Sequence, residues 1–151
     1  MSFRSSAPEA KTIKKLAFVP PEEKILAGGQ SLFTSPKRSL GVIKLLFYWP
    51  CGTAHQPTPM LARAAQTLRL SGNKTLSSEE IQEGFEYWGA SANPDVGLLS
   101  SSLVLQTQKQ HLEQSLKWLL EQGAEPLFPE QELTVFKQVE TASLLRRMQT
   151  P

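Results

Sequence analysis

The first part of the sequence alternates short apolar runs with turn-forming residues, and this pattern predicts strands. Two strand-like pieces, 24–26 and 31–34, flank Gly28-Gly29, and paired glycines suit the positive φ angles of a tight hairpin turn. A further turn is expected at 35–38. Residues 42–49 are rich in β-branched and aromatic side chains, so they predict a short and largely buried strand.

Helical spacing of apolar side chains dominates much of the remaining chain. Helices are predicted at 59–70, 77–89, 109–122 and 130–148. The second has the clearest start, because Ser77 and the Glu three residues later have the spacing of a capping box. The expected apolar faces are Leu61, Ala64, Ala65 and Leu68; Ile81, Phe85 and Trp88; Leu112, Leu116, Leu119 and Leu120; and Leu133, Phe136, Val139, Leu144 and Met148.

Two more strands are expected between the second and third helices, at 90–93 and 98–107. Residues 94–97, Pro-Asp-Val-Gly, would form the turn between them, and side chains from Leu99 to Leu105 alternate in the manner of a strand. Strands at the start and in the middle, interleaved with helices, predict an α+β fold. We expect a mainly antiparallel sheet with helices packed on one face.

Composition excludes several classes of function. The 151 residues suit one domain at 22–151, preceded by an extended arm at 1–21. The net charge of +2, from 16 basic and 14 acidic residues, is too even to indicate nucleic acid or an anionic membrane as a partner.

We find no signal-peptide core and no membrane-spanning run, so a cytoplasmic location is expected. Cys51 is the only cysteine, which excludes an intrachain disulfide.

Cys51, His55 and His111 have the most direct potential for chemistry. Cys51 and His55 lie close together in the proline-rich loop 50–59, but two ligands without a second pair do not make a structural zinc site. A Cys/His nucleophile pair is the alternative, although no local third group would orient the imidazole. The simplest interpretation is a loop thiol and a surface imidazole, and His111 is interpreted as a solvated histidine at a helix start.

The order of short motifs is more informative than any single residue. After the first long strand come a helix with Leu61-Ala62, then residues 86–91 (Glu-Tyr-Trp-Gly-Ala-Ser), then residues 126–129 (Pro-Leu-Phe-Pro) before the last helix. This order resembles the N-terminal half-domain of the insulinase/pitrilysin-type zinc metallopeptidases, which include the mitochondrial processing peptidases. The resemblance covers about residues 22–151.

The resemblance also indicates where the active site of that family would lie. Active members carry two zinc-binding His and a general-base Glu on one helical face. Aligning the family's Leu-Ala on Leu61-Ala62 places these roles at Arg63, Gln66 and Thr67. Arg63 would repel a metal ion, Gln66 cannot take up a proton at neutral pH, and Thr67 is a poor zinc ligand.

The third zinc ligand of the family is a Glu in the helix after the Pro-x-Phe-Pro connector. Aligning the connector on residues 128–130 places this ligand at Ser143, and a second family carboxylate falls on Phe136. Glu140 lies nearby but would not restore the other ligands. The resemblance therefore implies a degenerate site at Arg63, Gln66, Thr67 and Ser143, with no catalytic residue, no metal ligand and no cofactor, where active relatives bind zinc.

An inactive member of this family would be a non-catalytic subunit or pseudopeptidase with a structural, partner-binding or peptide-binding role. Family members usually work as two halves or two subunits around a chamber, so the resemblance implies a catalytic paralogous subunit or a second copy as partner, and peptides as ligands. Family half-domains are longer, so we expect a truncated C-terminus. The alternative function is an active hydrolase with a non-standard site around Cys51, His55 or Glu140.

Overall fold

The computed structural model describes residues 19–35 and 40–149, and the chain divides into two compact units, Met1–Ser39 and Leu40–Pro151. In the first unit, β1 (Glu22–Ile25) and β2 (Ser31–Thr34) form an antiparallel hairpin. Gly29 has a φ of 81°, and its N–H donates to the Leu26 carbonyl at 2.9 Å. The glycine pair therefore makes the predicted hairpin. Residues 1–18 of the expected arm and 36–38 of the expected turn lie outside the described residues.

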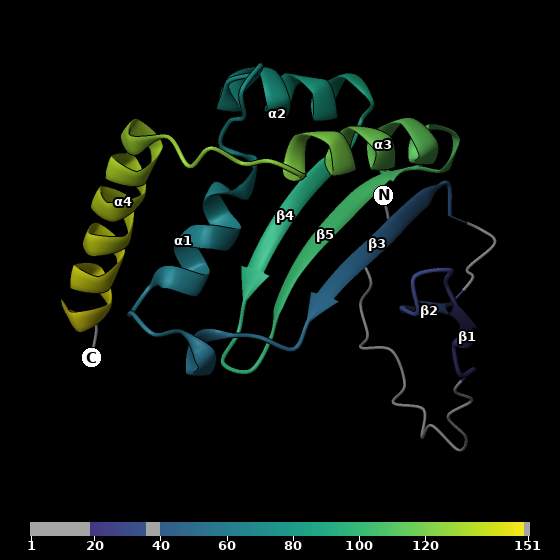
Figure 1. Cartoon of the computed structure of the whole chain (residues 1–151), viewed down its shortest axis with the longest axis horizontal. Helices are drawn as coiled ribbons and strands as arrows, with labels where there is room; N and C mark the ends of the chain where they lie inside the picture. Colours follow the sequence, from purple (N-terminus) through teal and green to yellow (C-terminus); the bar gives the residue numbers. More distant parts are fainter. Residues whose placement is uncertain (1–18, 36–39, 150–151) are drawn as a thin grey trace, which may run out of the picture. The chain divides into compact units, whose positions relative to one another are not determined.

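The second unit contains a three-stranded antiparallel sheet. Its strands are β3 (Val42–Trp49), β4 (Ser91–Val96) and β5 (Ser101–Gln108), in the order β3-β5-β4. The central strand β5 lies between its two neighbours (Figure 1); it pairs with β3 along its whole length and with β4 over residues 101–106. The long β3–β5 ladder joins segments far apart in the sequence, and it fixes which side chains share each face of the sheet.

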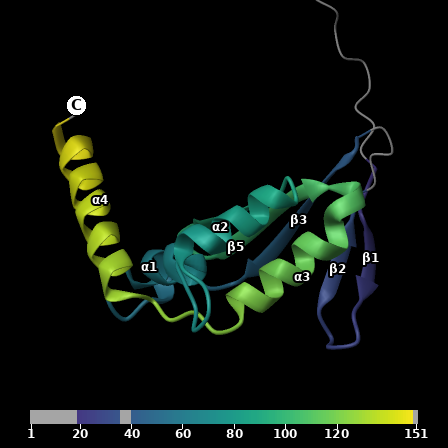
Figure 2. The same cartoon turned by 90° about the horizontal axis from the view of Figure 1, so that it is seen from above.

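Helices cover one face of this sheet. The helices of the described residues are α1 (Leu61–Thr67), α2 (Ser78–Tyr87), α3 (Leu112–Gly123) and α4 (Glu130–Gln149). Short 3₁₀ turns occupy Thr53–His55, Leu68–Leu70 and Lys109–His111. Helix α1 lies between β4 and α4, whereas α2 and α3 lie over the sheet (Figures 1 and 2). The α+β prediction, with an antiparallel sheet and helices on one face, is confirmed.

The hydrophobic core lies between the sheet and α2 and α3. Its buried members are Ile81, Phe85, Ala90, Leu103, Leu105 and Leu119. The register places Leu45 opposite Leu105 and Phe47 opposite Leu103, so alternate side chains of β3 also face this layer. One polar contact lies within it, because the hydroxyls of Thr107 and Ser115 are buried and 2.8 Å apart.

Strand β3 is not largely buried, contrary to the sequence prediction. Its side chains alternate between half-buried and exposed, and Val42, Leu46 and Tyr48 are exposed on the face without helices. The reason is that helices cover only one face of the sheet and β3 lies at its edge. A continuous apolar run does not distinguish a strand buried on both faces from an edge strand with one uncovered face.

The turn between β4 and β5 was also predicted in the wrong place. Residues 94–96 belong to β4, and the turn follows them, with the Gly97 N–H donating to the Ser100 carbonyl at 2.8 Å. Pro94 is tolerated because β4 is an edge strand and one of its sides has no ladder partner. Leu98 and Leu99 therefore lie in the turn and are exposed.

The predicted apolar faces of several helices are only partly buried. In the first helical segment Leu68 is buried, whereas Leu61 and Ala65 are exposed. Leu120 of α3 is exposed as well. Within α4 only Phe136 is buried, while Val139, Leu144 and Met148 are exposed. Helix α4 is covered along one narrow face, which carries Glu132, Leu133, Phe136, Glu140 and Ser143.

Within the described ranges, none of the helices combines the length and the apolar character that crossing a membrane requires.

Candidate functional site

An ion pair joins α1 to α4 at the position where the aligned zinc motif begins. The Nε of Arg63 donates to Oε1 of Glu140 at 2.8 Å, across 77 residues of sequence. The Arg63 side chain is 43% exposed and that of Glu140 only 14%. Glu140 reaches this place because it lies on the covered face of α4, one helical turn before Ser143. Arg63, which the resemblance aligns with the first motif position, is therefore a cation that already has a carboxylate partner.

The residues aligned with the other motif positions differ from one another in burial and in hydrogen bonding. The Nε2 of Gln66 donates to the hydroxyl of Ser101 at 3.3 Å. The Oε1 of Gln66 is buried and has no hydrogen-bond partner among the described residues. Thr67 is exposed, Ser143 is half-buried, and Phe136 is buried. These side chains offer amide, hydroxyl and aromatic groups where zinc would need imidazole or carboxylate.

The donor set does not fit a zinc ion. Zinc in proteins is held by three or four side chains drawn from His, Cys, Asp and Glu. Among the described residues, no group of three or more such side chains could hold a metal ion. The carboxylate of Glu140 is engaged by Arg63, whose positive charge would repel a second cation.

Cys51 and His55 are not hydrogen-bonded to each other in the described part of the chain. Both residues are exposed, and the Nδ1 of His55 accepts a hydrogen bond from the Gly52 N–H at 3.3 Å. Among the described residues Cys51, His55 and Glu140 form no hydrogen bonds with one another. The hydrogen bond that would link a base to a nucleophile is therefore not formed among these three residues.

His111 is half-buried rather than fully solvated. Its ring lies 5.6 Å from that of Trp88, at a tilt of 48°, and its Nε2 lies 3.2 Å from the Nε2 of Gln110. The aromatic contact explains its partial burial, because Trp88 covers one side of the imidazole. His111 therefore has a packing role at the start of α3.

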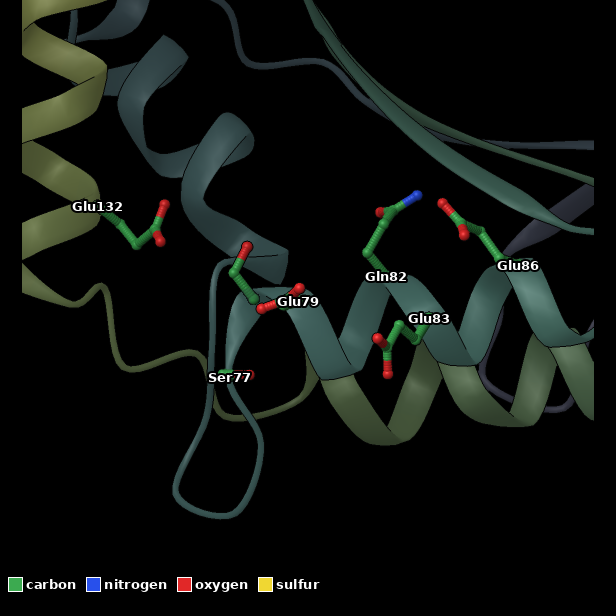
Figure 3. Close-up of a pocket in the computed structure, with 7 residues that line it drawn as sticks. Ser77, Glu79, Gln82, Glu83, Glu86 and Glu132 are labelled. Atoms are coloured by element: carbon green, nitrogen blue, oxygen red, sulfur yellow. The ribbon is translucent and has the colours of Figure 1, made fainter.

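An open acidic depression lies over α2 and the start of α4. It has a volume of about 650 Å³. The lining residues are Ser77, Ser78, Glu79, Gln82, Glu83, Glu86 and Glu132. Figure 3 shows that these carboxylates project separately from the helices instead of converging on one point. Glu79 and Glu132 lie in the first turns of α2 and α4, where the helix dipole favours acidic residues, so these two need no chemical explanation.

Two smaller cavities meet at Arg69, and neither was predicted from the sequence. Each has a volume of about 230 Å³. The first is lined by Phe47, Trp49, Arg69, Leu103, Leu119, Leu120, Gly123 and Ala124. The second is lined by Ala65, Gln66, Arg69, Gly123, Ala124, Pro126 and Phe128. The Cζ of Arg69 lies 4.9 Å from the Trp49 ring centroid, a cation–π contact that no sequence spacing would reveal.

Comparison with known proteins identifies the fold. No protein-family model and no curated protein matches the sequence. The inactive domain of an M16 peptidase from Pseudomonas fluorescens matches with a TM-score of 0.75 and 20% identity, over 88% of this chain and 33% of that chain. A protease from Helicobacter pylori matches with a TM-score of 0.67 and 20% identity, over 81% and 30% of the two chains.

Pitrilysin also matches, with a TM-score of 0.65 and 21% identity, over 91% of this chain and 15% of its own. The protein therefore has the fold of an M16 peptidase half-domain. It spans a third or less of each of these three chains.

Proposed function

We propose that this chain is a non-catalytic relative of the insulinase-type zinc peptidases, with a structural, partner-binding or peptide-binding role. The observation that carries the proposal is the Arg63–Glu140 ion pair, because it occupies the start of the aligned zinc motif. In an active relative a zinc ion would be the cation between the two helices. Here the guanidinium of the chain itself is that cation.

This replacement has a direct electrostatic consequence. An arginine side chain stays protonated at any accessible pH, so the positive charge at position 63 is permanent. A divalent ion approaching Glu140 would meet this charge first, and it would have to break an ion pair of 2.8 Å. Metal binding is therefore opposed by charge repulsion as well as by the lack of ligands.

Loss of the general base supports the same conclusion. Hydrolysis by a zinc peptidase requires a side chain that takes a proton from the metal-bound water. The aligned position is Gln66, whose amide cannot act as a base at neutral pH and whose Nε2 is already a donor to Ser101. Binding and activation of water are thus both unsupported on this helix.

The exposed apolar surfaces suit a role in binding partners. Val42, Leu46 and Tyr48 are exposed on the sheet face that carries none of the described helices, and they are 50%, 55% and 62% accessible. Val139 and Met148 of α4 are likewise exposed. Contiguous exposed apolar surface often marks protein–protein contact. We propose a catalytic paralogous peptidase subunit or a second copy of the chain as the partner.

A peptidase assay on the purified chain tests the proposal. Unstructured peptides are incubated with the chain, with and without added zinc, beside an active zinc peptidase as positive control. We expect no cleavage above a blank. Cleavage that a chelator abolishes and that Gln66→Ala also removes would contradict the proposal. Cleavage that resists the chelator but disappears in Cys51→Ser, His55→Ala or Glu140→Gln would instead establish the alternative hydrolase.

A further inference from the structure

The two cavities that meet at Arg69 combine an apolar hollow with a cation. The first is lined by aromatic and leucine side chains between the sheet and the end of α3. The second lies beside Gln66 and Phe128, and both are bordered by Arg69, Gly123 and Ala124. Arg69 thus borders both an apolar cavity and a more polar one.

Arg69 has no counter-ion among the described residues. Its guanidinium lies over Trp49, with the Cζ 4.9 Å from the ring centroid, and it forms no ion pair in the described ranges. A guanidinium has donors arranged to bind both oxygens of a carboxylate. Charge complementarity thus favours a ligand with a carboxylate at this point.

Gln66 adds an unused acceptor. Its side chain lines the second cavity, and its buried Oε1 has no hydrogen-bond partner in the described part of the chain. Buried polar atoms are normally hydrogen-bonded. An unpaired Oε1 of Gln66 therefore retains the capacity to accept a hydrogen bond from an N–H donor. A group that carries an N–H near a carboxylate would match both Gln66 and Arg69.

The size of the first cavity limits its occupant. An engineered apolar cavity of about 150 Å³ holds a benzene molecule. The volume of about 230 Å³ therefore accepts one large apolar side chain, but not a long hydrocarbon. The apolar character of Phe47, Leu103 and Leu119 favours a leucine-sized or phenylalanine-sized group.

We propose that these cavities bind the free C-terminal residue of a peptide that ends in a large apolar side chain. That side chain enters the first cavity, the terminal carboxylate binds Arg69, and the amide N–H of the same residue donates to Oε1 of Gln66. The inference rests on the peptide-binding role within the proposed function and names the part of the peptide that is recognised.

Binding of matched peptides tests this inference. The probe is an acetylated tripeptide ending in phenylalanine, with either a free carboxylate or a C-terminal amide, titrated by calorimetry in the presence of a chelator. We expect the free acid to bind at least about tenfold more tightly than the amide, because a charge-assisted hydrogen bond contributes about that much. Arg69→Gln should abolish the preference, whereas Lys137→Gln, an exposed charge on α4, should retain it.

Two further measurements keep the test decisive. Ala124→Leu, which narrows both cavities without removing charge, should weaken binding of the free acid, and thermal melts should show that the variants remain folded. 3-Phenylpropanoate, which has the ring and carboxylate but no amide, should bind more weakly than the peptide acid.

Equal binding of acid and amide, an unchanged preference in Arg69→Gln, or equal binding of 3-phenylpropanoate would overturn the inference. The chelator excludes metal-dependent cleavage during these titrations. A failure of the peptide-binding test would therefore leave the result of the peptidase assay unaffected.

Discussion

The Arg63–Glu140 ion pair matters more for chemistry than for stability. Arg63 is 43% exposed, and ion pairs open to water typically contribute less than about 1 kcal/mol because solvent screens them. The same pair nevertheless keeps a permanent positive charge beside the carboxylate of Glu140, which is only 14% exposed. This charge would oppose the approach of a second cation to Glu140.

The pH dependence of stability should have an identifiable contribution from Glu80. The backbone N–H of Ser77 donates to this carboxylate at 2.8 Å, and that hydrogen bond lowers the pKa of Glu80 below its ordinary value of 4.5. A lowered folded-state pKa means that ionised Glu80 stabilises the fold above pH 4.5. This stabilisation is lost as the pH falls through the folded-state pKa.

Glu80→Gln should therefore melt at a lower temperature than the native chain at neutral pH. This difference in melting temperature should disappear well below pH 4.5. Thermal unfolding, monitored by circular dichroism at neutral and at acidic pH, measures the two melting temperatures. Glu83→Gln, which removes a charge from the same helix without touching Ser77, is the matched control and should show the smaller pH-dependent change. A melting-temperature difference for Glu80→Gln that stays constant with pH would contradict a stabilising contribution from ionised Glu80.

Helices α2 and α3 approach closely at Gly84. A Cβ at this position would overlap the ring of Trp118, whose indole N–H donates to the Ile81 carbonyl at 3.1 Å. Because this hydrogen bond fixes the indole, the ring cannot move aside without losing it. Glycine is therefore required by packing, even though it is a poor helix former.

Gly84→Ala should destabilise the chain by about 1–3 kcal/mol, the usual cost of overpacking, despite a gain in helix propensity of up to about 1 kcal/mol. Urea unfolding monitored by fluorescence gives the change. Gly123→Ala is the control, because its added Cβ would meet its nearest neighbour, Cδ2 of Leu70, at an ordinary 3.7 Å. Similar unfolding midpoints for the two variants would show that α2 and α3 do not pack as described.

Local signals predicted the elements well where the residues themselves specify the backbone. Gly28-Gly29 marked the hairpin, and the spacing of Ser77 and Glu80 marked the start of α2, where the capping box is present. The turn after β4 was misplaced because Pro94 normally interrupts strands, and only the edge position of β4 makes it acceptable. Edge position depends on the whole sheet, so local sequence does not contain it.

At the scale of the whole molecule, the order of elements was predictable but the contacts of the site were not. The predicted fold agrees with the M16 peptidase half-domain, whereas the residues assigned to the motif positions stay a prediction. The sequence did not indicate that Arg63 would pair with Glu140, because the two residues are 77 positions apart. Nor did it reveal Arg69 over Trp49, a contact that exists only once the sheet and the helices are packed.

Zinc titration of two chains tests the central claim most directly. One is the native chain, and the other carries Arg63→His, Gln66→Glu, Thr67→His and Ser143→Glu together, which supplies imidazole and carboxylate groups at the aligned positions. Calorimetry, with circular dichroism to verify folding, should show no stoichiometric zinc binding by the native chain and one bound equivalent in the substituted chain. One tightly bound equivalent in the native chain, weakened by Glu140→Gln, would contradict the account.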